Sequence, residues 1–175
     1  SLCVECFTEE DIFKHLDLDY TPPELREDQG EFEAAETGKI PRLVEWGEMK
    51  GSLHNHSDWS DGRQSLEQLI EDCIELGFGY WAVTDHSKSS FQANGLQVSR
   101  LEKQIETIRN LNEKLSQENT PFRLLTGTEV DILSDGSLDF EDPVLAKLDV
   151  VVASIHQGFT QTKDQLTQRL INAAE

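Results

Sequence analysis

From Met49 onward, short apolar runs alternate with segments whose apolar residues recur at helical spacing. The runs predict strands over residues 50–54, 80–84, 122–132 and 150–156. The intervening segments are long enough for helices that connect parallel strands. This alternation is typical of a parallel α/β fold.

Each of the three predicted helices begins at a capping pair: Ser65 with Gln68, Ser99 with Glu102, and Thr162 with Gln165. Their apolar faces hold Leu66, Leu69, Ile70, Cys73 and Ile74 in the first, Leu101, Ile105, Ile108 and Leu115 in the second, and Leu166, Leu170 and Ala174 in the third. Gly77 is placed to end the first helix. We expect these faces to pack on the sheet.

The fourth predicted strand is almost continuously apolar from Val150 to Ile155. Such a run predicts a strand that is covered on both faces, as in a barrel or a doubly wound sheet. After the third strand, Ser134-Asp135-Gly136 forms a turn sequence and predicts a short hairpin that ends near Phe140.

The first 48 residues have a different pattern, broken by Pro22-Pro23, Gly30 and Pro41, and acidic residues outnumber basic ones there. Thr8 is placed to cap one short helix, and a second is predicted over residues 31–36. We therefore expect a mostly helical or irregular linker over residues 1–48 and a separate domain over residues 49–175.

The chain has 175 residues and a formal net charge of -19, with 34 acidic and 15 basic residues. This charge argues against non-specific nucleic-acid binding, which needs clustered Lys and Arg. No apolar run is long enough to span a bilayer and no secretory signal is visible, so a cytoplasmic protein is expected. Cys3 and Cys6 form a single CxxC, which is a weak indication of zinc.

Side chains that commonly bind metals follow or lie within each predicted strand. They are His54 and His56, Asp85 and His86, Glu129, and His156. The carboxyl ends of parallel strands open on one face of the sheet, where α/β proteins place their active sites. Four of the five histidines in the chain would meet there, and the fifth, His15, lies in the acidic first segment.

His54 and His56 are two residues apart on an extended chain, so their imidazoles leave the same side about 6.6 Å apart at the backbone. In the turn sequence that follows, Asp61 is placed to bend back as an oxygen ligand. Asp58 is the competing carboxylate, for which an Asx turn or a helix cap is the preferred interpretation. An isolated HxH would also be compatible with two solvent-facing histidines.

Asp85 and His86 point to opposite sides of their strand, and we take His86 as the ligand. Asp85 is then either a carboxylate that orients a metal-bound histidine or a structural hydrogen-bond acceptor. Glu129 lies in an apolar strand where an unpaired carboxylate is costly, and bridging two cations would offset that cost. Gly127, two residues earlier, would let the backbone come close to a ligand.

These nitrogen and oxygen ligands, without a thiolate, suit zinc, manganese or iron. Closely spaced cations activate water and hold phosphate oxygens. No GxSxG sequence, P-loop or Cys-His pair is visible, so a metal-activated water is the expected nucleophile.

The string GSLHNHSDWSDGRQSLEQLIEDCIELGFGYWAVTDHSKS, followed by GTEVDIL and DVVVASIH, closely resembles the PHP (polymerase and histidinol phosphatase) superfamily. Its HxH, TDH, GxE and SxH motifs occur in the family's order. The chain is most similar to the C-terminal PHP domain of bacterial family X DNA polymerases, and the segment TPPELREDQGEFEAAETGKIPRLVEW resembles the linker that precedes that domain.

The resemblance implies a distorted (βα)7 barrel, up to three divalent metal ions, manganese or zinc and possibly iron, and phosphoesterase activity such as 3′ to 5′ exonuclease action or phosphomonoester hydrolysis. It implies three ligand sets: His54, His56 and Glu129; Glu129 and His156; Asp61 and His86. Many relatives have His at the position of Asp61. Arg63, Lys88 and Asn94 would lie in loops on the active-site side, where each is either a phosphate contact or simply an exposed polar residue.

The family pattern includes a further His and an Asp-x-His pair after the last residue of this chain. We therefore expect about the first four βα units of the barrel, weak metal affinity and low turnover in this chain alone, and self-association through an uncovered sheet edge. DNA would be reached through the full-length bacterial polymerase.

Two other interpretations stay open at this point. An amidohydrolase-type barrel also begins with HxH, but it needs a bridging carbamylated Lys where this chain has Glu129. The other is a non-catalytic module that binds metal for structure or supports a polymerase.

Overall fold

The computed structural model describes residues 5–174, and along the chain these divide into two units between Glu48 and Met49. Cys3 lies outside the described residues, so the CxxC pair is not described. No helix in the described residues is long and apolar enough to cross a bilayer.

The unit that ends at Glu48 contains α1 (Glu9–His15), the short 3-10 helices Pro23–Leu25 and Trp46–Glu48, and α2 (Glu31–Glu36). Both predicted short helices are confirmed. The Thr8 hydroxyl accepts from the backbone N–H of Asp11 in a capping box, and Arg26 pairs with Glu9 at 2.9 Å. The short helices of this unit are thus held by local caps and by contacts across the unit.

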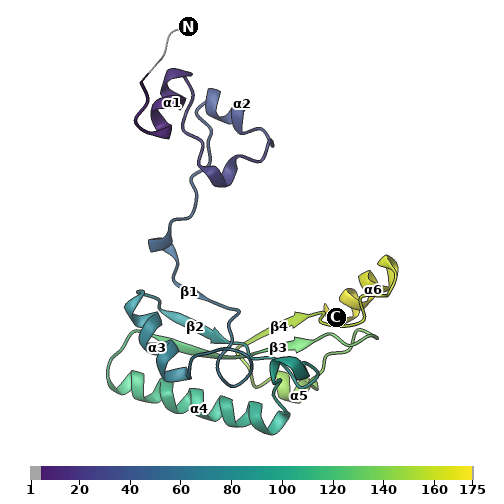
Figure 1. Ribbon diagram of the computed structural model, residues 1–175. Coiled ribbons are helices and arrows are strands. Elements are labelled where there is room, and N and C mark those ends of the chain that lie inside the picture. Colours follow the sequence, from purple (N-terminus) through teal and green to yellow (C-terminus); the bar gives the residue numbers. More distant parts are fainter. Residues whose placement is uncertain (1–4, 175) are drawn as a thin grey trace. The chain divides into compact units, whose positions relative to one another are not determined.

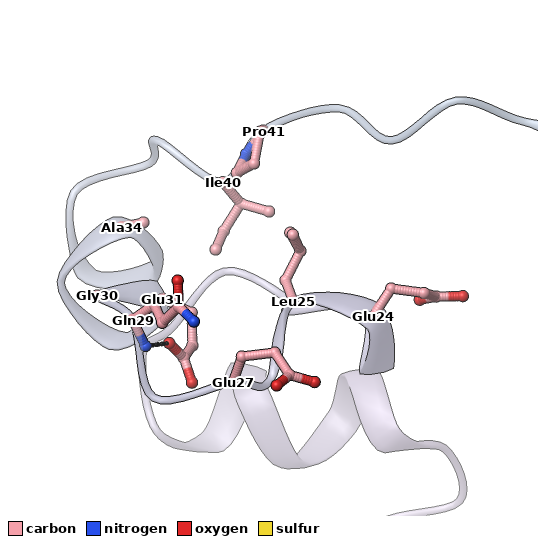
Figure 2. Close-up of a pocket in the computed structure, with 9 residues that line it drawn as sticks. All are labelled: Glu24, Leu25, Glu27, Gln29, Gly30, Glu31, Ala34, Ile40 and Pro41. Atoms are coloured by element: carbon pink, nitrogen blue, oxygen red, sulfur yellow. Dashed lines mark hydrogen bonds between the residues drawn. The ribbon is translucent and has the colours of Figure 1, made fainter. Parts of the chain in front are cut away.

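This first unit also contains a pocket (Figure 2). Its lining combines apolar side chains with carboxylates: Glu24, Leu25, Glu27, Gln29, Gly30, Glu31, Ala34, Ile40 and Pro41. The Glu31 carboxylate already accepts from the backbone N–H groups of Asp28 and Gln29, at 2.8 Å each, so it closes the turn that leads into α2.

The second unit contains a four-stranded parallel sheet in the order β1-β2-β3-β4. Its strands are β1 (Gly51–Ser52), β2 (Tyr80–Val83), β3 (Arg123–Asp131) and β4 (Val150–Ser154). Its helices are α3 (Leu66–Glu75), the 3-10 helix Phe91–Ala93, α4 (Val98–Gln117), α5 (Asp142–Leu145) and α6 (Lys163–Ala174). The strands curl into a half-barrel, as expected for part of a PHP-type barrel (Figure 1).

The core lies between the sheet and helices α3 and α4 (Figure 1). One cluster joins Leu66, Ile70, Cys73, Phe78, Val83, Ile108, Leu115, Phe122 and Leu124, and a second joins Leu96, Leu101, Ile105, Val130 and Phe140. The predicted apolar face of α4 is buried throughout, whereas Ile74 of α3 is 41% exposed. The helix periodicity therefore identified half of the buried residues in these two clusters.

Two of the three predicted capping pairs are confirmed, at Ser65 with Gln68 and at Thr162 with Gln165. The pair at Ser99 is wrong, because α4 begins at Val98 after Gln97. Just before the helix, Leu96 forms a bridge with Ser87, and its N–H donates to the His86 carbonyl at 2.7 Å. The helix therefore starts as soon as that pairing ends.

The first strand is shorter than predicted because the chain leaves the ladder after Ser52 and returns to β2 at Asn55. There the Asn55 N–H donates to the Thr84 hydroxyl at 2.8 Å, and the Thr84 N–H donates to the Asn55 carbonyl at 2.7 Å. The segment 53–54 between these anchor points is free of the ladder, so His54 lies on a bulged and exposed part of the chain.

The prediction that β4 is covered on both faces is wrong for this structure. Its residues alternate between half-buried and exposed, and Val151 is 40% exposed. The predicted apolar face of α6 is also wrong, since Leu170 is exposed. Helix α6 instead packs through Arg169, whose guanidinium donates to the carbonyls of Ile132 and Gln157, so α6 covers the chain after β3 rather than the outer face of β4.

The buried face of α4 yields a stability prediction. Ile108→Ala should lower the free energy of unfolding by about 2–5 kcal/mol, because it leaves a cavity at a side chain with no exposed surface. The matched change Ile74→Ala, at a half-exposed position, should cost clearly less. Urea unfolding followed by circular dichroism checks both, and equal costs would contradict the assigned core.

Cysteine reactivity gives a second prediction. Burial raises the pKa of the Cys73 thiol to about 11, and the side chain lies in the core. Because the thiolate is the reactive form, iodoacetamide at pH 8 should modify the exposed Cys6 and leave Cys73 unmodified until the protein unfolds. Peptide mass spectrometry before and after urea treatment measures this; equal labelling of both thiols in the native protein would disprove it.

Candidate metal centre

The carboxyl ends of the four strands converge on the buried carboxylate of Glu129, which is 5% exposed. The parallel sheet sets this position, since Glu129 pairs with Val152 of β4 on one side and forms a parallel bridge with His86 on the other. Four imidazole nitrogens lie close to its two oxygens: Nε2 of His54 at 3.3 Å, Nε2 of His56 at 3.2 Å, Nδ1 of His86 at 3.2 Å and Nε2 of His156 at 3.1 Å.

These side chains form three overlapping groups, in each of which the potential ligand atoms lie within 4.8 Å of one another. The groups are His54, His56 and Glu129; His56, Asp61 and His86; and His86, Glu129 and His156. The structure thus brings together all six residues predicted as ligands. It also places His56 beside Asp61 and His86, and His86 beside Glu129 and His156, which the resemblance did not indicate. Their role as ligands stays a prediction.

Asp61 reaches this cluster through the turn after His56. Its Oδ1 lies 2.8 Å from Nδ1 of His56 and its Oδ2 lies 3.7 Å from Nε2 of His86, while 47% of its side chain is exposed. Gly62 lets this turn close, because a Cβ there would lie 2.5 Å from the His56 carbonyl oxygen. Asp58, the competing carboxylate, belongs to none of the three groups among the described residues.

Asp85 holds the same turn from inside the protein. Its buried carboxylate accepts from the N–H of Ser57 at 2.8 Å and from the side chains of Ser57, Ser60 and Gln104 at 2.5 Å each. These bonds connect Asp85 to the turn and to α4. Within residues 5–174 the Asp85 carboxylate makes no hydrogen bond to a histidine. Of the two roles left open from the sequence, the structure supports the structural acceptor.

Outside the six predicted ligands, Asp131 is a carboxylate that contacts a histidine, and the sequence reasoning missed it. Its Oδ1 lies 2.7 Å from Nδ1 of His156, and the residue is only 1% exposed. Strand alternation could have indicated this contact. Asp131 follows Glu129 by two residues and therefore lies on the same face of β3.

The explanation given for Gly127 is also wrong. A Cβ at this position would lie 2.8–2.9 Å from the Thr84 side chain and from the carbonyl oxygens of Val83 and Val150. The glycine therefore allows close approach of neighbouring strands, and no space beside it is open to a ligand.

The phosphate-contact residues fall into different settings. Arg63 is exposed. The Lys88 ammonium lies 5.7 Å from the centre of the Phe140 ring, in a cation–π contact. Asn94 donates to the carbonyls of Trp59 and Ser60 at 3.1 and 3.4 Å, so its amide already has a structural role in joining two loops.

The environment favours the protonation states that metal binding requires. Burial lowers the pKa of His86, which keeps its imidazole neutral. Burial alone would raise the pKa of Glu129, but hydrogen bonds with Ser154 and His54 and the charges of His86 and His156 hold it below its ordinary value. An ionised Glu129 carboxylate is therefore the expected state.

One nitrogen atom of the cluster indicates directly that these residues fit a metal ion. Nδ1 of His86 is buried and makes no hydrogen bond within the described residues, although it faces the Glu129 carboxylate. A lone pair of a neutral imidazole aimed at a carboxylate is satisfied when a cation lies between them. The nitrogen and oxygen donors fit zinc, manganese or iron.

This fold and this cluster define an α/β protein with a candidate multinuclear metal centre at the carboxyl ends of its strands. The PHP domain family model matches residues 52–174, and a DNA polymerase beta thumb model matches residues 2–27. The chain therefore belongs to the PHP domain family. This membership decides against the amidohydrolase-type barrel.

The chain is also similar to "DNA polymerase/3′-5′ exonuclease PolX" of Bacillus subtilis (strain 168), with 44% identity over 166 residues. The alignment covers 95% of this chain and 28% of that relative, so the chain spans a little more than a quarter of the relative's length. The thumb match precedes the PHP match along the chain and lies within the predicted linker region 1–48.

Metal binding should raise the thermal stability of this chain. A bound ion stabilises the folded state by RT ln(1 + [L]/Kd), about 2.7 kcal/mol at a hundredfold excess over Kd. Differential scanning fluorimetry with Mn²⁺ or Zn²⁺ should show a rise in Tm that EDTA reverses. Glu129→Gln should abolish most of the rise, because Glu129 belongs to two of the three groups.

The control is Glu113→Gln, on the exposed side of α4, which should keep the full metal response. A rise in Tm that survives Glu129→Gln would show that the ions bind elsewhere.

Proposed function

We propose that this chain is the metal-dependent phosphoesterase part of a PolX-type DNA polymerase. It would hydrolyse phosphodiester bonds, as a 3′ to 5′ exonuclease, or phosphomonoesters. The observation that carries the proposal is the buried Glu129 carboxylate, surrounded at 3.1–3.3 Å by histidines from three other strand ends. The relative's name, which includes 3′-5′ exonuclease, supports the choice of reaction.

The residues of the chain would hold the reactants in place. His54, His56 and Glu129 would bind one ion, and His86, Glu129 and His156 a second. The third group shares His56 and His86 with the other two, and a neutral imidazole offers its lone pair to one ion only, so Asp61 would be the ligand that this group adds for a third ion. Bound ions would supply an activated water and neutralise charge on the phosphate. Glu129, shared by two groups, would keep their ions close together.

The exposed side of the centre is where substrate would enter. Asp61 and His54 are about half exposed, whereas Glu129 is buried, so phosphate would approach from the side of the HxH turn. The chain carries a net charge of -19, which repels a phosphate anion. Metal ions and the exposed Arg63 would supply the local positive charge, and Lys88 would be available only by leaving Phe140.

DNA would be the partner of the longer polymerase, as the relative's name suggests. The outer edge of β4 has no strand partner within the described residues, and Val151 beside it is exposed. An open parallel edge of this kind supports association with another strand, either from the same polymerase or from a second copy.

Hydrolysis assays test the proposed activity. The chain should release nucleotides from a 3′-labelled oligonucleotide or phosphate from p-nitrophenyl phosphate, in a Mn²⁺-dependent and EDTA-sensitive way. His56→Ala and Glu129→Gln should each lower the rate roughly 100-fold or more, because metal polarisation contributes several kcal/mol to such reactions. His15→Ala is the matched control, since this exposed histidine lies on α1 outside the cluster, and its rate should be unchanged.

Metal binding without hydrolysis of either substrate, both by this chain and by a longer polymerase that contains it, with Mn²⁺, Zn²⁺ or Fe²⁺, would contradict the enzyme and favour a non-catalytic metal-binding module. Hydrolysis that persists in both variants would mean that another protein or another site is responsible.

A further inference from the structure

Asp131 is a buried carboxylate whose single basic partner within residues 5–174 is His156. Its Oδ1 lies 2.7 Å from Nδ1 of His156, and its Oδ2 accepts from the Ser90 hydroxyl at 2.7 Å. The Ser87 hydroxyl lies farther from the same Oδ2, at 3.5 Å, and accepts from the Asp131 backbone N–H at 3.0 Å. A carboxylate is costly to bury, so these contacts must hold it in place.

These contacts connect two parts of the metal centre. Ser87 directly follows His86, and its N–H donates to the Glu129 carbonyl at 3.0 Å. Asp131 therefore joins the loop that carries His86 to the imidazole of His156, which comes from the other side of β3.

We infer that Asp131 is a positioning residue that fixes the tautomer and the ring orientation of His156. An ionised carboxylate only accepts hydrogen bonds, so it requires the proton of a neutral His156 ring on Nδ1. Nε2 then carries the lone pair, and it is the nitrogen that faces Glu129 at 3.1 Å. The inference rests on the proposed metal centre and assigns a role to a residue outside the three ligand groups.

An amide at this position would change the chemistry while keeping the shape. Asn has one accepting oxygen and one donating nitrogen, whereas Asp131 faces His156 on one oxygen and a serine hydroxyl on the other. When the amide nitrogen faces the ring, His156 must carry its proton on Nε2 and cannot bind a metal through that atom. Loss of such an orienting partner typically costs 10–100-fold in metal affinity.

Asp139 offers a matched control in the same region. It is also a buried carboxylate, and it accepts from the N–H and the hydroxyl of Ser89, at 2.8 and 2.7 Å. It makes no contact with a histidine within the described residues. Asp139→Asn therefore removes a buried charge beside the same loop without touching the His156 ring.

Isothermal titration of the full chain with Zn²⁺ or Mn²⁺ tests the inference. Asp131→Asn should weaken binding 10–100-fold, whereas Asp139→Asn should change it by less than about threefold. The decisive measurement is a double-mutant cycle with His156→Ala. If Asp131 acts through His156, Asp131→Asn should cause no further loss of affinity in the His156→Ala protein.

If Asp131 has only a general structural role, the result should differ. The loss of metal affinity from Asp131→Asn would then add to the loss from His156→Ala. Additive losses, or equal losses in the Asp131 and Asp139 variants, would overturn the inference. Circular dichroism establishes that each variant is folded. If Asp131→Asn does not fold, Ser90→Ala removes one donor to the same carboxylate and should weaken binding less, again only while His156 is present.

The results also separate this inference from the proposed function. Wild-type protein that binds neither ion would contradict the proposed metal centre, and the positioning role with it. Normal wild-type binding that is unchanged in Asp131→Asn would contradict the positioning role alone.

Discussion

The second unit depends on one electrostatic constraint, which is a carboxylate buried at the centre of a parallel sheet. Glu129 lies inside β3, and an unpaired charge there would strongly oppose folding. Four imidazoles surround it, and their rings also contact one another, with centroids 4.4–5.6 Å apart. Neutral rings tolerate this crowding and charged rings would not. The arrangement is therefore best satisfied by cations between the nitrogens and the carboxylate.

Parallel pairing supplies the geometry of this arrangement. The register that aligns Val83 with Thr126 continues to the bridge between His86 and Glu129, and β4 brings Val152 to the other side. A shift of one residue would move Glu129 to the opposite face, into the core beneath α4. The close approach of the strands at Gly127 helps to fix this register.

Buried carboxylates and small polar side chains hold the loops that carry the ligands. Asp85 fixes the turn after His56 through Ser57 and Ser60, and Asp139 fixes the loop after His86 through Ser89. These bonds explain how segments without regular structure can present side chains at defined distances. They also explain why a chain with a large acidic excess buries several of its carboxylates.

The sequence by itself determined the α/β class, the buried face of α4 and the residue types at the strand ends, because apolar periodicity and residues at strand ends are local properties. It also identified all six side chains that make up the three groups around Glu129. Only the tertiary structure decided that Asp131 rather than Asp85 contacts a histidine, that Gly127 serves strand packing, and that β4 and Leu170 remain exposed. Each of these features depends on which segments lie against one another. Hydrogen bonds between residues 25–44 positions apart produce no periodic pattern in the sequence, so the sequence does not reveal them.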